Sequence, residues 1–146
     1  MKKRTLTSIS VLGLLLMLAV AAVQAQSGTR IEANVPFDFS AGDSTFPAGV
    51  YTFHRISDRS LMIRSADGKV RSVVQAPLAI GVQGSRGAGG LVFNRYENDY
   101  FLFQVWLKAD SGRQLFPSKT ERKLAQKQQL AERIKRERVE VAARPR

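Results

Sequence analysis

The residues that could carry catalysis are few, and their spacing does not assemble them. His54 is the only histidine and the chain has no cysteine, so neither a multi-histidine nor a thiolate metal site can form. A nucleophilic triad would need a nucleophile and an orienting carboxylate around His54. Ser57 and Asp58 are close to it in sequence, but closeness in sequence does not establish a catalytic geometry. We therefore predict no enzymatic activity, no metal and no cofactor.

Two further patterns could belong to a ligand site. Residues 81–90 include five glycines, but they lack the Lys-Ser/Thr ending and the following helix of a phosphate-binding loop. We expect a flexible loop at the mouth of a barrel or the end of a sandwich, where it could line a site. Tyr96, Tyr100 and Trp106 could stack on a sugar or another flat ligand, or could serve as core and cross-strand partners.

The C-terminal basic residues indicate a partner more directly. Residues 26–118 hold ten basic and eight acidic residues, whereas residues 119–146 hold ten basic and four acidic ones. Within this basic tail, three lysines follow one another at a spacing of four, where like charges repel on a helix. An anionic surface would relieve that repulsion, while the alternative is a solvated helix that keeps the protein in solution. The candidate contacts are Lys119, Lys123, Lys127, Arg133 and Arg136.

The N-terminus has the three parts of a secretory signal peptide. Lys2, Lys3 and Arg4 precede an apolar run over residues 11–23, and Val23-Gln24-Ala25 offers a cleavage site. The run is shorter than the roughly 20 residues of a spanning helix, and no basic stop-transfer cluster follows it. We expect residues 1–25 to be a signal peptide and the mature chain to begin at Gln26. The protein is then exported, to the periplasm or beyond, without remaining an integral membrane protein.

The elements that would position these residues are mainly strands. Apolar side chains alternate with polar ones from Ile31 to Phe39, and Pro36 predicts that this strand is an edge or is bent there. Asp67-Gly68 predicts a hairpin, and so does the short break between residues 91–96 and 100–107. Both faces of the second of these runs are largely apolar, so we expect it to be a central strand. The strand and turn patterns of residues 26–117 therefore predict an all-β fold, a compact antiparallel sandwich or small barrel of six or seven strands.

The pattern changes at Ser118, where Ser118-Lys119-Thr120-Glu121 matches a capping box. The chain is then rich in Lys, Arg, Gln, Glu, Ala and Leu to about Val141, a composition that favours helix. We expect residues 118–146 to form a basic, C-terminal α-helical tail. Because the apolar strands end before this tail, we expect the β-domain to fold without residues 122–146.

Four segments resemble, in their order, a group of small secreted bacterial proteins of unknown function. They are Val35-Pro36-Phe37-Asp38-Phe39, Phe46-Pro47-Ala48-Gly49-Val50-Tyr51, Leu91-Val92-Phe93-Asn94-Arg95-Tyr96 and Tyr100-Phe101-Leu102-Phe103-Gln104-Val105-Trp106. The resemblance covers most of residues 31–125 and implies a shared fold, a secretory signal and a Lys/Glu/Arg-rich C-terminal segment. It implies no activity and assigns no functional residue.

Two functions are compatible with these patterns. The first is a non-enzymatic envelope or extracellular interaction protein, whose basic tail contacts anionic cell-envelope polymer, lipid head groups or a partner protein. The second is a small-ligand-binding β-barrel with residues 81–90 at its mouth. A filled core would favour the first, and an internal cavity lined by the aromatic candidates would favour the second. We expect no nucleic acid partner in vivo, because an exported protein seldom meets one.

Overall fold

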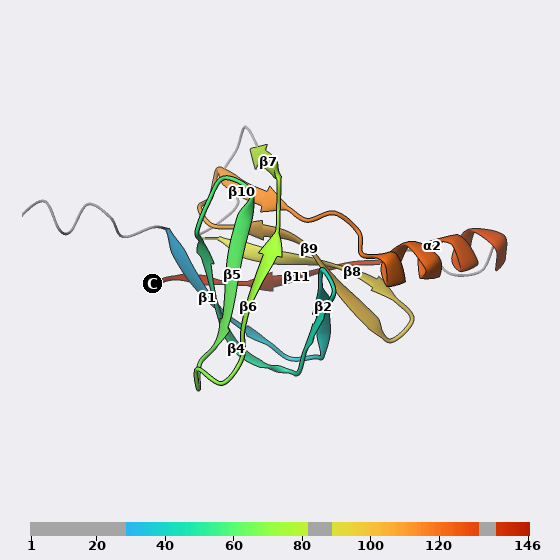
Figure 1. The fold of residues 1–146 in the computed structure, drawn as a ribbon, viewed down its shortest axis with the longest axis horizontal. Coiled ribbons are helices and arrows are strands. Elements are labelled where there is room, and N and C mark those ends of the chain that lie inside the picture. Colours follow the sequence, from blue (N-terminus) through green and yellow to red (C-terminus); the bar gives the residue numbers. More distant parts are fainter. Residues whose placement is uncertain (1–28, 82–88, 132–136) are drawn as a thin grey trace, which may run out of the picture.

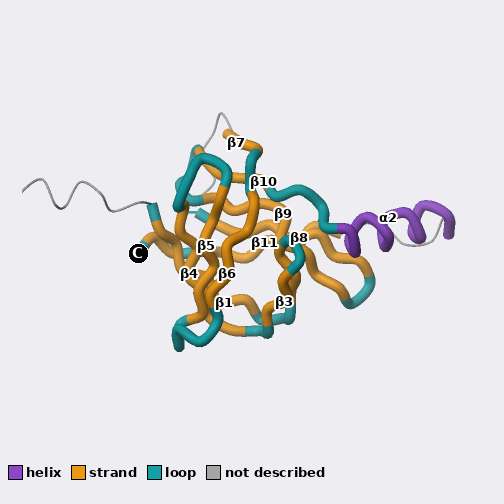
Figure 2. The backbone as a smooth tube through the Cα atoms, viewed as in Figure 1, coloured by secondary structure: helices purple, strands orange, loops and turns teal. Residues whose placement is uncertain are grey.

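The fold is a β-sandwich with one helix near the C-terminus. A computed structural model describes residues 29–81, 89–131 and 137–146, which form twelve strands and the helix α2 (Figures 1 and 2). The predicted signal peptide and most of the glycine-rich segment 81–90 lie outside the described residues. The all-β class is confirmed, and the two sheets form a sandwich that does not close into a barrel. The strands outnumber the predicted six or seven because some predicted runs are split and two strands form in the tail.

The first sheet carries the N-terminal hairpins. Its strand order is β12-β1-β4-β5-β6, and every neighbouring pair is antiparallel. The β5–β6 turn contains Asp67-Gly68, as the sequence predicts, and Gly68 has a φ of 72° that favours glycine. The strands are β1 (Arg30–Val35), β4 (Gly49–Arg55), β5 (Ser60–Ser65), β6 (Arg71–Gln75) and β12 (Arg144–Pro145).

The second sheet carries the later hairpins and has the central order β11-β8-β9-β10-β7. The short β2–β3 hairpin joins it where Ser40 pairs with Phe101 in parallel. The predicted hairpin of β8 and β9 is confirmed, and β9 is a central strand, paired with both β8 and β10. The strands are β2 (Phe39–Ala41), β3 (Ser44–Phe46), β7 (Leu78–Gly81), β8 (Gly90–Tyr96), β9 (Asp99–Trp106), β10 (Ser111–Gln114) and β11 (Glu137–Ala142).

Prolines stand where the chain passes between the sheets. Pro36 separates β1 from β2, Pro47 separates β3 from β4, and Pro77 separates β6 from β7. Proline has no N–H to give to a ladder, so it is tolerated where one ladder stops and the next begins. The bend predicted at Pro36 is confirmed. Two hydrogen bonds hold the corner at Pro47: Ala48 N donates to Asp38 Oδ1 at 2.7 Å, and Tyr51 OH donates to the Pro47 carbonyl at 2.7 Å.

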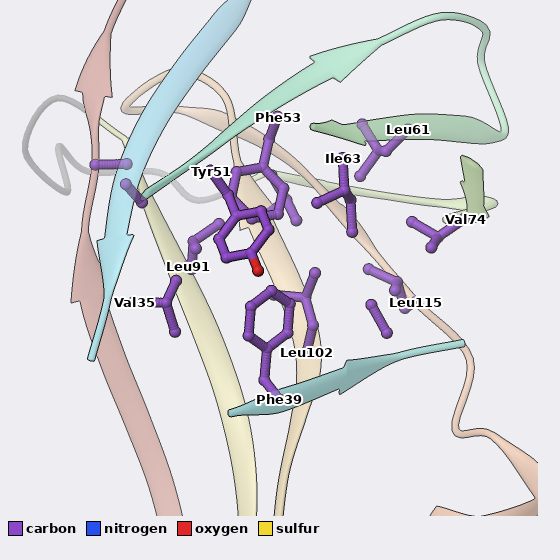
Figure 3. Close-up of a cluster of buried hydrophobic side chains, with 14 of the residues drawn as sticks. Val35, Phe39, Tyr51, Phe53, Leu61, Ile63, Val74, Leu91, Leu102 and Leu115 are labelled. Atoms are coloured by element: carbon purple, nitrogen blue, oxygen red, sulfur yellow. The ribbon is translucent and has the colours of Figure 1, made fainter. Parts of the chain in front are cut away.

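The space between the sheets is filled by a core of aliphatic and aromatic side chains (Figure 3). Phe39 stacks on Phe46 with ring centres 5.0 Å apart, and Tyr51 and Phe93 meet Phe39 edge-on at 5.3 and 5.4 Å. These four rings and Phe53 are each at most 2 % exposed. Large rings packed edge-to-face supply much of the buried apolar area of so small a domain.

The predicted alternation along β9 is broken by a bulge. Val92 pairs with Gln104 and Phe93 with Leu102, which leaves Phe103 as an extra residue on β9. A bulge places two residues of one strand opposite one of its partner and shifts the alternation. Leu102 and Val105 therefore both join the core, although an unbroken period of two assigns them to opposite faces.

The prediction of a helix over most of residues 118–146 is wrong beyond α2 (Lys119–Ala131). Strand β11 pairs with β8 over six residues, and β12 then pairs with β1, so the end of the chain contributes to both sheets. Val139 and Val141 pack against the core, while Glu140 between them and Ala142 after them are exposed. The free edge of β8 gives these residues a ladder and a place for two valines, which outweighs a weak helix propensity.

Candidate functional site

Helix α2 is attached to the sandwich through its first turn. Ser118 Oγ accepts a 3.1 Å hydrogen bond from the Glu121 N–H, as the predicted capping box requires. The Glu121 carboxylate does not reach back to the cap. It turns inward, is 4 % exposed, and accepts hydrogen bonds from Asn94 Nδ2 at 2.8 Å and Tyr96 OH at 3.3 Å. The only acidic residue of α2 is therefore buried against β8.

The remaining charges of α2 form a basic surface. Lys119, Lys123 and Lys127 are exposed, and at 100° per residue they lie on the side of the helix opposite Glu121. Arg122 is exposed beside them. We call the three lysines the lysine face. The structure thus presents three of the five predicted anion contacts together, at the end of the sandwich from which α2 projects (Figure 1). The other two, Arg133 and Arg136, lie outside the described residues.

The three aromatic candidates do not form one ligand-stacking site. Tyr96 and Trp106 are 3 % and 6 % exposed, and they occupy opposite ends of the β8–β9 ladder. Tyr96 packs edge-on against Phe101, and the Trp106 indole N–H donates to Gln104 Oε1 at 3.2 Å. Tyr100 is half-buried and stacks on Phe37 with ring centres 3.9 Å apart. Their observed contacts are the packing and cross-strand contacts of the alternative interpretation.

A concave site lies on the outer face of the first sheet. It is a pocket of about 270 Å³ with a lining that includes Arg30, Thr52, His54, Met62, Arg64 and Arg146. The strand registers bring these residues together: Arg30 is opposite His54 and His54 is opposite Met62, while Thr52 is opposite Arg64. Each alternates with a neighbour that points into the core, such as Ile31, Phe53 or Ile63, so its side chain faces outward.

The sequence pattern singles out none of the arginines in this pocket. Arg30 and Arg64 are ordinary polar positions of alternating strands, and Arg146 belongs to a segment predicted to be helical. Only the pairing of β12 with β1, of β1 with β4 and of β4 with β5 makes them neighbours. The sequence alone indicates only that Arg30 and Arg64 both fall on the polar face of an alternating run.

The pocket is rich in positive charge. Arg146 Nη1 makes a 2.7 Å ion pair with Glu32 Oε2 on β1. Within the described residues Arg30 and Arg64 make no ion pair, and Arg71 stands directly opposite Arg64 on β6. Like charges directly opposite one another in a sheet destabilise it. A bound anion would offset this cost.

The described residues hold no assembled metal site. Their histidine and carboxylate side chains form no group of three or more that could hold a metal ion. No helix in this part of the chain is long and apolar enough to cross a membrane. Comparisons with family models, curated proteins and solved structures found no match to the chain. A function is therefore best inferred from the two basic surfaces, which are the lysine face of α2 and the pocket on the first sheet.

Proposed function

We propose that the protein is exported and binds, without catalysing a reaction, an anionic polymer of the cell envelope through the lysine face of α2. One observation carries the proposal: α2 sequesters its only carboxylate, Glu121, and presents exposed charges that are all basic. Three lysines at a spacing of four repel one another, and a polyanion laid along the helix would relieve that repulsion. The helix projects from the sandwich, so an extended partner can reach it (Figure 1).

The composition of α2 favours a polymer over a lipid bilayer. A helix that lies in a membrane interface buries a broad apolar face. The exposed surface of α2 carries one large hydrophobic side chain, Leu130, which is 87 % exposed. Coulomb attraction alone therefore has to supply the binding energy, and it falls away within a Debye length of roughly 8 Å at physiological salt.

The filled interior also supports an interaction protein over a ligand-binding barrel. A barrel that encloses a ligand needs space between its walls, whereas Phe39, Tyr51 and Phe53 lie between the two sheets of this sandwich (Figure 3), in a core that also includes Phe46 and Phe93. The aromatic candidates for ligand stacking are engaged in packing.

The proposal that the protein is exported rests on the signal-peptide pattern at the N-terminus. Mass spectrometry of the protein recovered outside the cytoplasm should give an N-terminus at Gln26, and intact protein that still begins with Met1 would contradict it.

The binding component is tested by co-sedimentation of the protein with an insoluble acidic polysaccharide and with anionic phosphatidylglycerol vesicles, at low and high salt. The decisive variant changes Lys119, Lys123 and Lys127 to Gln. The matched control changes Arg55, Arg59 and Lys108 to Gln, which removes the same charge from exposed positions on the sandwich.

We expect the wild type and the control variant to bind the polysaccharide at low salt, and the lysine variant to bind it much more weakly. High salt should release all three proteins. Equal losses in the two variants would show that net charge, and not the lysine face, decides binding. Binding to the vesicles but not to the polysaccharide would identify lipid head groups as the partner and would contradict the proposal.

A further inference from the structure

The pocket on the outer face of the first sheet is a second basic surface, independent of α2. Its lining includes the C-terminal residue, Arg146, and the C-terminus lies at the end of the molecule opposite to α2 (Figure 1). Its residues come from three adjacent strands, β1, β4 and β5, from Ala66 just after β5, and from Arg146 after β12. A site built on paired strands holds its side chains more rigidly than a loop does, which suits specific recognition.

The charge balance of this face is strongly positive and only partly compensated. Arg30, Arg64 and Arg71 belong to the outward rows of the sheet, and Arg144 stands opposite Glu32. Glu32 is the only carboxylate in these rows, and it makes an ion pair with Arg146. Arg30 and Arg64 therefore keep their guanidinium groups available, without an ion pair in the described part of the chain, on two sides of one pocket.

The donors that converge there match an oxyanion with several oxygens. Guanidinium groups present a planar fork that fits phosphate or carboxylate, and they remain charged at every physiological pH. Thr52 adds a hydroxyl and His54 an imidazole between the two arginines. A phosphoryl group offers three acceptor oxygens and a charge of about −1.5 to −2 at pH 7, so it can accept from several of these donors at once. A carboxylate has only two oxygens and one charge.

The size of the pocket indicates that the anion carries an organic body. A volume of about 270 Å³ is larger than one phosphate requires and lies near the lower limit of small-molecule pockets. Met62 adds a flexible thioether side chain to the lining, which can pack against the apolar face of a sugar ring. We infer that this pocket binds a phosphate monoester on a sugar-sized molecule, with Arg30 and Arg64 as the anchors of the phosphoryl group.

The inference is tested by isothermal titration calorimetry of the purified protein with glucose 6-phosphate. Glucose, glucuronate and inorganic phosphate serve as comparison ligands. Arg30→Gln and Arg64→Gln each remove one anchor from an exposed position, so the fold should be retained, and circular dichroism checks this. The matched control carries Arg122→Gln and Lys123→Gln on α2, which removes more positive charge than either anchor variant, at the far end of the molecule.

We expect saturable binding of glucose 6-phosphate, no binding of glucose, and a Kd that rises about tenfold or more in each anchor variant, as the loss of a charge-assisted hydrogen bond predicts. The α2 control should bind like the wild type, which separates this site from the lysine face. Absence of saturable binding at millimolar ligand overturns the inference. So does equal affinity for glucuronate, which would assign a carboxylate, or an unchanged Kd in folded R30Q and R64Q.

Discussion

Asn94 and Glu121 lie 27 residues apart in the sequence and meet inside the protein, where Asn94 Nδ2 donates a 2.8 Å hydrogen bond to Glu121 Oε1. This contact fixes the start of α2 on β8 and removes the only acidic side chain of the helix from its exposed surface. The same contact therefore attaches the helix to the sandwich and leaves only basic charges on its exposed surface.

Glu121→Ala should lower the free energy of unfolding by about 1–3 kcal/mol, because it leaves the buried Asn94 amide without this acceptor. Glu121→Gln keeps an acceptor oxygen and should lose less. Urea unfolding measures both. Gln126→Ala, on the exposed side of the same helix, is the control and should change stability by no more than about 0.5 kcal/mol. Equal effects of E121A and Q126A would show that the Asn94 contact contributes nothing.

The C-terminal strands should be part of the folded domain, which reverses the expectation that the body folds without residues 122–146. Val141→Asp places a charge where a half-buried valine packs on the core, and should cost at least the roughly 1.5–3 kcal/mol that burial of such a side chain provides. Ala142→Asp changes the exposed neighbour on the same strand and should cost far less. Thermal unfolding of the pair distinguishes a strand from a helix here, because a solvated helix would tolerate both changes alike.

Trp106 should report on its contact with Gly112, its partner across β9 and β10. A Cβ on Gly112 would come within 2.8 Å of the Val105 carbonyl oxygen and 3.0 Å of the Trp106 indole. Gly112→Ala should therefore displace the single tryptophan, shift its fluorescence toward longer wavelengths and lower the melting temperature. Gly49→Ala is the control, since its Cβ would meet only the Tyr51 ring, at 3.7 Å. An unchanged emission spectrum in G112A would contradict the described packing.

Local signals in the sequence identify the hairpins, the bend at Pro36, the central position of β9 and the Ser118 cap, because each depends on residues close in the chain. The strand β11 escapes such reasoning. Its composition is that of a helix, and only Val139 and Val141 carry a period of two. What makes it a strand is the free edge of β8, some 45 residues earlier in the sequence, which no local pattern reveals.

Local sequence patterns also fail to predict the pocket on the outer face of the first sheet. Arg30, Arg64 and Arg146 become neighbours through the order and register of four strands, so their shared chemistry is a property of the sheet. The lysine face is different, because its spacing of four lies within one helix. Sequence reasoning therefore finds the local basic surface and misses the one that strand pairing assembles.

Tyr51 should make the stability of the protein fall at alkaline pH. Burial, and to a smaller extent the carboxylates of Asp67 and Asp38, raise the pKa of Tyr51 above its ordinary value of 10.0. Its hydroxyl donates to the Pro47 carbonyl at 2.7 Å, a bond that only the neutral phenol can make. The folded protein thus keeps a proton that the unfolded chain releases near pH 10, so the stabilisation is complete below that pH and is lost as the pH rises through the folded pKa.

Urea unfolding of wild type and Tyr51→Phe between about pH 7 and pH 11 measures this loss, since unfolded tyrosine titrates near 10. At neutral pH Tyr51→Phe should be less stable by about 1 kcal/mol, because it lacks the hydrogen bond to Pro47. Above pH 10 the wild type should lose stability more steeply than the variant, so the difference between them shrinks. Tyr96 and Tyr100 are present in both proteins, so their own titration cancels in the comparison. A difference that stays constant across this range would show that Tyr51 titrates alike in the folded and unfolded chain.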